Sequence, residues 1–445
     1  MAVTHQGPKG TRDFYPDAMA VRRHIEAAWR QASIDCGFEE IEGPTFEHLS
    51  LYTAKSGPGI VNELFSFRRA GGEDDYALRP EFTPTLARMV AAKAGSLPLP
   101  VKWFGIPVHF RAERQQRGRL REFVQWNVDL IGVNGAAADA EVIGCAVLAM
   151  ERLGLKATDV RVRLSHRGAV AAALTSAGVA ADKTAEAFEL LDRRDRMEPA
   201  EFDKRATLLG LSSAARARFD HIAASRLPMS ASAKTLAECL GVPEASLEGA
   251  TELAQRLQSM DLAPWCEWDF GIVRGLAYYT GTVFELHAAG GKERAIAGGG
   301  RYDNLVELFG GPSMPAFGFG MGDVVLGLVL GDRGLLPADA MALLPRPDAY
   351  LISDGSDAAE QALPRLLMSL RRDGFQARSN WKTTRNIGKL LGDAAKARAR
   401  YAVILGAELA EGSVVVKNLD GGSQEKVSLQ GISDFIRASR RAGGP

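Results

Sequence analysis

The sequence predicts an α+β protein, in which helices flank an antiparallel sheet, a helical insertion interrupts the sheet, and a separate small α/β domain follows it. Short strand-like runs joined by tight turns occupy residues 37–131 and 267–323, as in antiparallel sheets. Residues 167–260 are rich in alanine and leucine and read as helical. Residues 349–406 alternate strand-like and helical segments, which predicts a largely parallel sheet.

Length and composition indicate a soluble globular protein of two or three domains. The chain has 445 residues, of which 46% are hydrophobic and 24% charged. It shows neither a run of ~20 apolar residues nor the apolar core of a signal peptide, so we expect no membrane association and a cytoplasmic location. The four cysteines are scattered and the seven histidines form no HxH or HxxxH pair. A structural zinc site, a disulfide framework or a histidine-ligated metal is therefore not expected.

The expected elements follow one another along the chain. In the amino-terminal part we expect a helix over 18–36, a strand and proline turn over 37–47, a hairpin with strands near 64–67 and 76–79, and a helix from Thr83 to about Ala94. After the insertion, strands are expected over 267–274 and 282–286, and an apolar helix after 318–323. The predicted domains are a core of residues 1–166 and 261–335, an insertion over 167–260, a proline-rich linker over 336–347 and a last domain over 348–445.

The most informative segment is an arginine-rich hairpin. Five arginines fall within residues 111–121, whereas the whole chain balances 54 basic against 54 acidic residues. Strand-like runs over 101–110 and 123–131 flank them, and Gly118 is the natural turn residue because glycine adopts positive φ without steric cost. So many guanidinium groups suggest a phosphate-rich partner, and zero net charge argues against indiscriminate nucleic-acid binding. A solvated arginine hairpin at a sheet edge is the alternative.

The strand that returns from this hairpin has one polar face. Its period of two places Phe123, Gln125, Asn127 and Asp129 on one side, and Val124, Trp126, Val128 and Leu130 on the other. Because the polar side lies beside the arginines, we expect it to line a site.

Several segments together resemble the class II aminoacyl-tRNA synthetases, and within them the histidyl-tRNA synthetase family. Residues 37–47 resemble the first class II motif, at the dimer interface, and residues 111–123 resemble the second, an ATP-binding hairpin. Residues 78–83 (Leu-Arg-Pro-Glu-Phe-Thr) and 273–285 are similar to the histidine-recognition elements of that family. The resemblance implies activation of histidine by ATP, transfer of the histidyl group to tRNA(His), Mg²⁺ accompanying ATP, and a homodimer.

The resemblance also implies roles for residues. Arg111 would bind the α-phosphate of ATP and the histidine carboxylate, Glu113 and Arg119 would bind ATP, and Phe123 would stack on adenine. Arg274 is the second catalytic candidate and would also contact histidine. The alternative for Arg274 is an ion pair with a carboxylate such as Asp269.

Histidine needs a carboxylate for its ammonium group and polar partners for both ring nitrogens. The resemblance assigns the ammonium group to Glu81 and Thr83, and the remaining contacts to Gln125, Asp129, Tyr278 and Tyr279. Ordinary strand packing is the alternative for the two tyrosines. We expect the glycines of residues 298–300 either to let the backbone approach the ligand or to form a tight turn.

The chain departs from the family pattern at the third class II motif. Val325 stands where an arginine is expected to clamp the γ-phosphate, so either another arginine, such as Arg301 or Arg117, replaces it or ATP binding is weakened. Ala277 stands where an acidic residue is common. These departures leave two alternatives: a catalytically silent paralogue that senses histidine as a regulatory subunit of ATP phosphoribosyltransferase, and a nucleic-acid-binding accessory protein.

The last segment carries a cluster of basic residues around Trp381, which resembles an anticodon-binding domain. The cluster consists of Arg378, Lys382, Arg385, Lys389, Lys396, Arg398 and Arg400. Cations and one exposed aromatic ring suit the single-stranded anticodon loop of a tRNA. In the alternative, these residues form a solvated helix face and Trp381 packs inward.

Overall fold

The structure is a computed structural model that describes residues 5–56, 58–194, 197–274, 279–290, 294–382 and 384–442. The chain divides into two compact units, Met1–Ala340 and Met341–Pro445, each of which is described by itself. The division falls within residues 336–347, the connection rich in proline.

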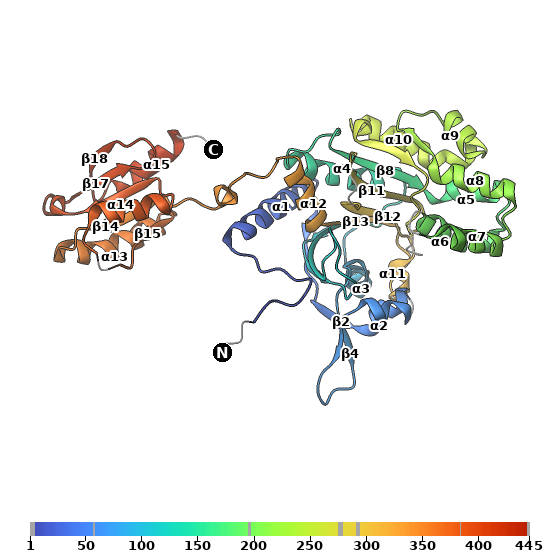
Figure 1. Cartoon of the computed structure of the whole chain (residues 1–445), viewed down its shortest axis with the longest axis horizontal. Helices are drawn as coiled ribbons and strands as arrows, with labels where there is room; N and C mark the ends of the chain where they lie inside the picture. The colour runs from blue at the N-terminus through green and yellow to red at the C-terminus, as the bar shows by residue number, and fades with distance from the viewer. Residues whose placement is uncertain are drawn as a thin grey trace. The chain divides into compact units, whose positions relative to one another are not determined.

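A large, mostly antiparallel sheet forms the centre of the first unit, as predicted (Figure 1). Its ten strands in the described part are β1 (Glu39–Glu40), β5 (Val101–Gly105), β6 (Val108–Phe110), β7 (Glu122–Ile131), β8 (Val160–His166), β9 (Arg226–Pro228), β10 (Cys266–Asp269), β11 (Thr282–Ala288), β12 (Ala297–Arg301) and β13 (Ala316–Gly322). The order is β1-β5-β7-β13-β12-β11-β8-β10-β9, with β6 on β7. The β1–β5 and β8–β10 pairs are parallel.

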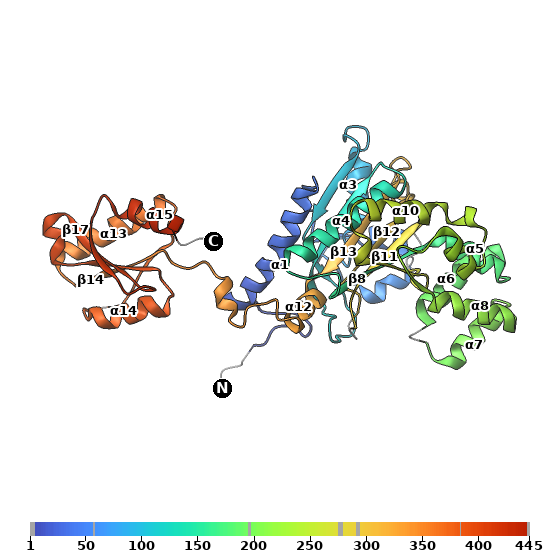
Figure 2. The same cartoon turned by 90° about the horizontal axis from the view of Figure 1, so that it is seen from above.

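Helices cover one face of this sheet. The described helices of the first unit are α1 (Pro16–Asp35), α2 (Leu49–Ser56), α3 (Thr83–Lys93), α4 (Ala136–Arg152), α5 (Arg167–Ser176), α6 (Thr184–Arg193), α7 (Pro199–Leu208), α8 (Ser213–Ala224), α9 (Ala233–Leu240), α10 (Glu248–Ser259), α11 (Leu305–Leu308) and α12 (Asp323–Asp332). In Figure 1 α4 and α10 lie over the strands, and in Figure 2, seen from above, they lie in front of them. Trp29 of α1 stacks on Trp126 of β7 at 5.9 Å between ring centroids.

The two faces of β7 match the predicted alternation. Val124, Trp126 and Val128 are buried in the hydrophobic core beneath these helices. The alternate residues face the opposite side of the sheet, where the helices leave space. This asymmetry follows from the period of two in a strand, and it fixes where a site can form.

A small three-stranded sheet stands apart from the large one. It has the order β2-β4-β3 and consists of β2 (Phe46–His48), β3 (Ser66–Arg68) and β4 (Asp75–Leu78). The β3–β4 pair is the predicted hairpin and projects from the unit (Figure 1). The segment after β4 leads into α3 and carries Glu81 and Thr83.

Residues 167–260 are not wholly helical, which corrects the prediction. They contain β9, which pairs antiparallel with β10 at the edge of the large sheet. Leu174 and Leu253 of this segment are also buried in the same hydrophobic cluster as Leu164 of β8. The segment therefore shares the core of the first unit, because its helices cannot bury their apolar faces alone.

The glycines of residues 298–300 do not form a tight turn; they lie in the middle of β12. On its neighbour β13, Gly318 pairs with Gly300, and Gly320 pairs with Gly298. The alternative of a turn is therefore wrong, because ladder hydrogen bonds on both sides hold this segment extended.

The second unit has a mixed sheet in the order β15-β14-β16-β17-β18. Its elements are β14 (Ala349–Ser353), α13 (Asp357–Arg372), β15 (Ala377–Ser379), α14 (Ile387–Lys396), β16 (Tyr401–Leu405), β17 (Ser413–Asn418), β18 (Gln424–Ser428) and α15 (Ile432–Ala442). The β14–β15 and β14–β16 pairs are parallel, whereas β16–β17 and β17–β18 are antiparallel. The prediction of a largely parallel sheet was thus wrong, because it missed the hairpin that continues from β16.

Candidate active site

A cavity of about 780 Å³ opens on the polar face of β7, and Leu191 of α6 and Ala223 of α8 also line it. The polar face of β7 lines it through Phe123, Gln125, Asn127 and Asp129, as the alternation predicted. The arginine-rich hairpin contributes Arg111 and Arg119, and Arg274 lines it from the segment after β10. The sheet thus brings together residues that are far apart in the sequence.

Glycines form the floor of this cavity. Side chains from neighbouring segments lie where the Cβ atoms of Gly298, Gly318 and Gly320 would be. A Cβ at Gly298 would overlap Nη1 of Arg274, and one at Gly318 would overlap Oδ1 of Asp129. At Gly320 it would lie 2.7 Å from Nε2 of Gln125. These glycines thus make room for side chains of the protein, and the expected approach of the backbone at residues 298–300 to a ligand stays a prediction.

Asp129 is a deeply buried carboxylate of the cavity wall, and Tyr302 is a polar partner of its side chain. It is 3% exposed, and the hydroxyl of Tyr302 donates a hydrogen bond to its Oδ1. Burial raises the pKa of Asp129 to about 7, although the bond from Tyr302 opposes the shift. The pair can therefore present an acceptor or a donor near neutral pH.

Sequence reasoning missed Tyr302, which also lines the cavity. The alternation along β12 could have indicated Tyr302, because Gly298, Gly300 and Tyr302 fall on the same face of an extended segment. The expectation of a turn at the glycines concealed this alternation.

A hydrogen bond to a backbone carbonyl and the charges of nearby glutamates hold Arg111 at the cavity wall. Its Nε donates to the carbonyl oxygen of Pro80 at 3.0 Å, next to Glu81. Burial lowers the pKa of the Arg111 guanidinium, and the charges of Glu81 and Glu113 oppose that shift. Glu81 and Thr83 both line the cavity, so the predicted ammonium-binding pair lies in the same space as Arg111.

Phe123 contacts a cation and a buried histidine. The Arg111 guanidinium carbon is 5.0 Å from the Phe123 ring centroid, and the His109 ring stacks on Phe123 at 5.6 Å. His109 is fully buried, and burial lowers its pKa well below the usual range. A neutral His109 therefore supports the aromatic ring without adding charge beside Arg111.

The hairpin closes as predicted, with φ of +75° at Gly118. Arg119 forms an ion pair with Glu113 and lines the cavity. Glu113 itself is not among the lining residues of the described chain. Glu113 pairs directly with Arg119, so the predicted ATP contact of Glu113 would require this pair to rearrange.

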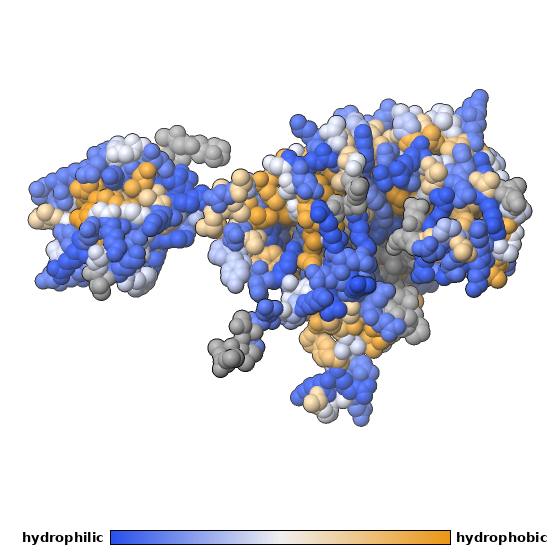
Figure 3. All heavy atoms as spheres, in the orientation of Figure 1, coloured by the Kyte–Doolittle hydropathy of each residue, from blue (hydrophilic) through white to orange (hydrophobic). Residues whose placement is uncertain are grey.

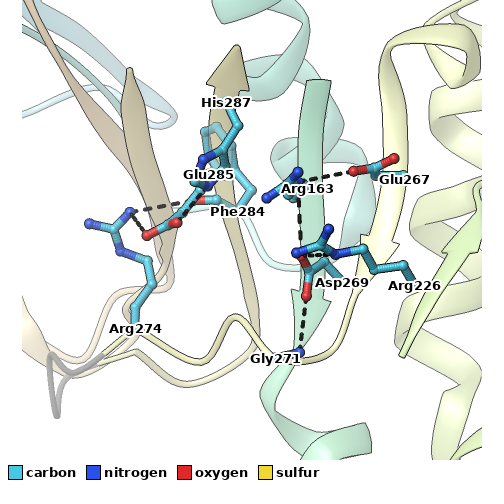
Figure 4. A network of polar contacts seen from close by, with 9 residues as sticks. All are labelled: Arg163, Arg226, Glu267, Asp269, Gly271, Arg274, Phe284, Glu285 and His287. Atoms are coloured by element: carbon cyan, nitrogen blue, oxygen red, sulfur yellow. Dashed lines mark hydrogen bonds and ion pairs between the residues drawn. The ribbon is translucent and has the colours of Figure 1, made fainter. Parts of the chain in front are cut away.

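Arg274 is fixed by a short chain of polar contacts (Figure 4). Its Nη1 lies 3.3 Å from Oε1 of Glu285 and 3.5 Å from the carbonyl oxygen of Phe284. The other Glu285 oxygen lies 2.9 Å from Nε2 of His287. Arg274 also has a φ of +50°, which is unusual for a residue with a side chain. Such backbone strain persists only where surrounding contacts hold it.

Asp269, the alternative partner of Arg274, is used elsewhere (Figure 4). It accepts a hydrogen bond from Nε of Arg226 at 2.9 Å and one from the Gly271 amide at 3.2 Å. Arg163 lies 3.9 Å away and pairs more closely with Glu267 at 3.0 Å. Arg274 thus pairs with a nearby carboxylate, as the alternative expected, but this carboxylate is Glu285 and not Asp269.

Of the two tyrosines in the predicted histidine site, Tyr279 lines the cavity and is 7% exposed. The guanidinium carbon of Arg274 lies 5.8 Å from its ring centroid. Tyr278 lies outside the described residues, as does Ala277.

Val325 lies in the cavity wall, where the resemblance predicted an arginine. Arg301 does not compensate, because its guanidinium donates to Asp139 and Asp303 and to the carbonyl oxygens of Val133 and Gly135. Neither Arg301 nor Arg117 is among the described residues that line the cavity. The expectation that one of them takes the place of Val325 is thus not supported.

In the second unit Trp381 is 97% exposed, which excludes the alternative of inward packing. The side chains of Arg378, Lys382, Arg385, Lys389 and Lys396 are exposed as well. Arg398 and Arg400 are only half-buried and lie next to the connecting segment: Arg398 donates to the Met341 carbonyl, and the Arg400 amide donates to Pro347. The exposed basic surface is therefore smaller than predicted.

The described residues show neither a metal-binding cluster nor a membrane-spanning helix. They contain no group of three or more histidine, cysteine, aspartate or glutamate residues arranged to hold a metal ion. None of their helices has the length and apolar character needed to cross a membrane.

Comparison with known proteins identifies relatives of both units. The family model described as histidyl-tRNA synthetase matches residues 10–322, and that described as anticodon binding domain matches residues 349–439. The histidine–tRNA ligase of Opitutus terrae is 39% identical over 98% of this chain and 98% of its own length. The crystal structure of histidyl-tRNA synthetase from Nostoc sp. PCC 7120 covers 98% of this chain and all of its own, with a TM-score of 0.79 at 22% identity. An ATP phosphoribosyltransferase regulatory subunit/histidyl-tRNA synthetase from Bacillus halodurans C covers 92% of this chain and all of its own, with a TM-score of 0.72 at 23% identity.

Proposed function

Because the chain belongs to the histidyl-tRNA synthetase family, we propose that it activates L-histidine with ATP and transfers the histidyl group to the 3′ end of tRNA(His). The observation that carries this proposal most directly is the convergence of Arg111, Arg274 and Asp129 on one cavity above a glycine floor. Two cations and a deeply buried acceptor suit a ligand that has a carboxylate at one end and a ring N–H at the other.

In the first step a histidine carboxylate oxygen attacks the α-phosphorus of ATP, and the bond to pyrophosphate breaks. This in-line displacement depends on positioning and on stabilising charge. Arg111 would hold the carboxylate and the α-phosphate, and Arg274 would stabilise the charge that develops there. The fixed position of Arg274, held by Glu285 and Phe284, favours this role because a preorganised cation needs no reorganisation during the reaction.

Recognition of histidine would use two groups of residues in the cavity wall, one for the ammonium group and one for the ring. Glu81 and Thr83 would bind the ammonium group, and Gln125 would lie along the ligand. Asp129, with Tyr302 behind it, would accept the ring N–H, and Tyr279 would pack against the ring. Tyr278 remains part of the proposal from the sequence alone.

ATP would bind where the hairpin meets the sheet. Phe123 would stack on adenine, and Arg119 and Glu113 would contact ATP once their ion pair opens. Mg²⁺ would arrive with ATP, because this ion is usually bound through substrate phosphates, retained waters and one or two carboxylates. Glu285, which lines the cavity, is a carboxylate suited to that contact.

In the second step a ribose hydroxyl of the tRNA 3′ end attacks the activated carbonyl carbon, and AMP leaves. The second unit would bind the anticodon through Trp381 and the exposed cations around it, since bases stack on aromatic rings and phosphates pair with charge. Such an activity serves translation, so we place the chain in the cytoplasm.

A homodimer would bury an aromatic surface on the small sheet. Phe46 and Phe67 are 48% and 43% exposed, and each ring lies within 6 Å of the ring of Tyr76. Figure 3 shows apolar surface over β2 and α2. Exposed aromatic clusters of this kind typify protein–protein interfaces, and this one lies next to the segment that resembles the dimer motif.

The alternative of a catalytically silent regulatory subunit is not favoured. The likeness to the Bacillus halodurans chain is a likeness of fold at 23% identity. The histidine–tRNA ligase relative matches at 39% identity over nearly the full length, and an anticodon-binding domain is present.

Histidine-dependent exchange between ATP and pyrophosphate tests the first step, and charging of tRNA(His) tests the second. We expect both activities from the purified chain. Histidine binding without exchange would favour the regulatory alternative and overturn this proposal.

A further inference from the structure

The register of the sheet extends the cavity wall beyond the predicted site residues. Gln125 of β7 lies opposite Gly322 of β13, and the Gly322 amide donates to the carbonyl oxygen of Ile296 at 3.3 Å. Gln125, Gly322 and Ile296 therefore form one row across three segments, and all three line the cavity.

Beyond this row the segments leave the sheet, because α12 begins at Asp323 and Arg294 precedes β12. Phe123, Val324 and Arg294 nevertheless all line the same cavity. Arg294 is the cation among these three residues, and its side chain is exposed.

Arg294 also bridges to the arginine-rich hairpin. Its Nη2 donates to the side-chain oxygen of Gln116, near the turn at Gly118. The hairpin and the segment before β12 therefore meet beside the cavity, whose wall includes Gly118, Arg119, Phe123 and Val324. A ligand stacked on Phe123 would have the Arg294 guanidinium within reach.

A cation in this part of the cavity wall would neutralise negative charge on the phosphates of ATP. The triphosphate of ATP carries several negative charges, and the wall formed by the start of α12 offers the apolar Val324 and Val325. Arg119 is partly neutralised by Glu113. A planar guanidinium can bind phosphate oxygens at two points, and one held by an amide partner can exchange that partner for phosphate.

We propose that Arg294 binds the β- and γ-phosphates of ATP and takes over the charge that Val325 cannot supply. This inference rests on the proposed function, because it assumes that ATP stacks on Phe123. It assigns to the segment before β12 a part in substrate binding.

Direct binding measurements separate a phosphate contact from a structural effect. We would measure the affinity of wild type and of Arg294→Ala for ATP and for AMP by isothermal titration calorimetry. We expect the substitution to weaken ATP binding at least ~10-fold, the scale of a charged hydrogen bond, and to change AMP binding less than ~2-fold. Arg294→Lys should fall between, because it keeps the charge and loses the fork.

Two further variants calibrate the result. Arg256→Ala, an exposed arginine of α10 outside the cavity wall, should bind ATP as wild type does. Arg117→Ala removes a hairpin arginine that does not line the cavity, and it should leave ATP affinity within ~2-fold.

The outcomes distinguish this inference from the proposed function. Any of three results overturns the inference: unchanged ATP affinity of Arg294→Ala, an equal loss of affinity for ATP and for AMP in that variant, or a larger loss of ATP affinity in Arg117→Ala. If wild type binds ATP but shows no histidine-dependent exchange, the proposed function is overturned. In that case a loss of affinity in Arg294→Ala that is specific to ATP would still support the phosphate contact. Wild type that binds no ATP overturns both.

Discussion

The side chain of Arg274 lies across Gly298, in the space that a Cβ atom at that position would occupy. Gly298 faces Glu285 in the β11–β12 register, so the same pairing that brings Glu285 to Nη1 of Arg274 also leaves room for the guanidinium. Catalytic geometry at Arg274 thus depends on a residue without a side chain.

Gly298→Ala should therefore disable the enzyme without unfolding it. The new methyl group would displace the Arg274 guanidinium, and we expect ATP–pyrophosphate exchange to fall by at least ~10²-fold, as for loss of one preorganised charge. Gly331→Ala, at an α12 glycine with open space around its Cβ position, is the matched control and should retain full exchange. Exchange at the wild-type rate in Gly298→Ala would contradict the described position of Arg274.

Arg111→Ala and Arg274→Ala should each lower exchange by at least ~10²-fold, because each removes a cation from the reacting phosphate. Single-turnover measurements of histidyl-adenylate formation would assign the loss to chemistry. Lysine at either position should recover little, since the two-point geometry of the guanidinium is lost. Near-normal rates in either alanine variant would refute the corresponding role.

The buried carboxyl of Asp129 should make stability depend on pH. Its pKa is raised to about 7 in the folded chain, against roughly 3.9 when unfolded. Between these values the folded state keeps a proton that the unfolded chain has lost, so the contribution of Asp129 to the free energy of unfolding falls as pH rises. Below the unfolded pKa the contribution is complete.

Thermal unfolding of wild type and Asp129→Asn checks this dependence. The Tm of wild type relative to the variant should decrease steadily as the pH is raised from about 4.5 to 7.5. The variant provides the reference, because its amide does not titrate. A Tm difference that stays constant over this range would show that the carboxyl has no raised pKa.

Trp381→Ala should impair charging and leave exchange unchanged. The indole is almost fully exposed and belongs to the second unit, so its removal should raise the KM for tRNA(His) at least ~5-fold, the scale of one lost stacking contact. Removal of residues 341–445, the whole second unit, should have the same selectivity with a larger effect. Equal loss of exchange and charging in a truncated chain that remains folded would contradict the anticodon assignment.

Phe67→Asp should weaken self-association. A charge within the cluster of Phe46, Phe67 and Tyr76 would oppose burial of that surface between two copies. Sedimentation equilibrium should show a dimer for wild type and a higher dissociation constant for the variant. Asp at the exposed Arg69 of the same hairpin controls for added negative charge, and a wild-type monomer would exclude the proposed dimer.

The strands and helices near the site were predictable because their patterns are local. The alternation of β7 assigned Phe123, Gln125 and Asp129 to one face, and the cavity lies on that face. The hairpin turn at Gly118 followed from the freedom of glycine at positive φ. The predicted turn at Gly298 and its neighbours failed because the same freedom also allows glycine in a strand where other side chains approach.

Some site residues could not be predicted from any pattern in the sequence. Arg294 stands outside every motif, and only the tertiary fold places it in the same cavity wall as Phe123 and Val324. Similarly, the partner of Arg274 depended on strand pairing, since Asp269 is nearer in sequence than Glu285 yet bonds to Arg226.

By itself the sequence determined the α+β class, the arginine-rich hairpin and the polar face of its return strand, because periodicity and turn chemistry act over a few residues. The tertiary structure alone decided that Tyr302 meets Asp129, that Glu285 holds Arg274 over Gly298, and that Arg294 reaches the hairpin. These contacts join segments that are up to 178 residues apart. They depend on strand order and register, which no local pattern specifies.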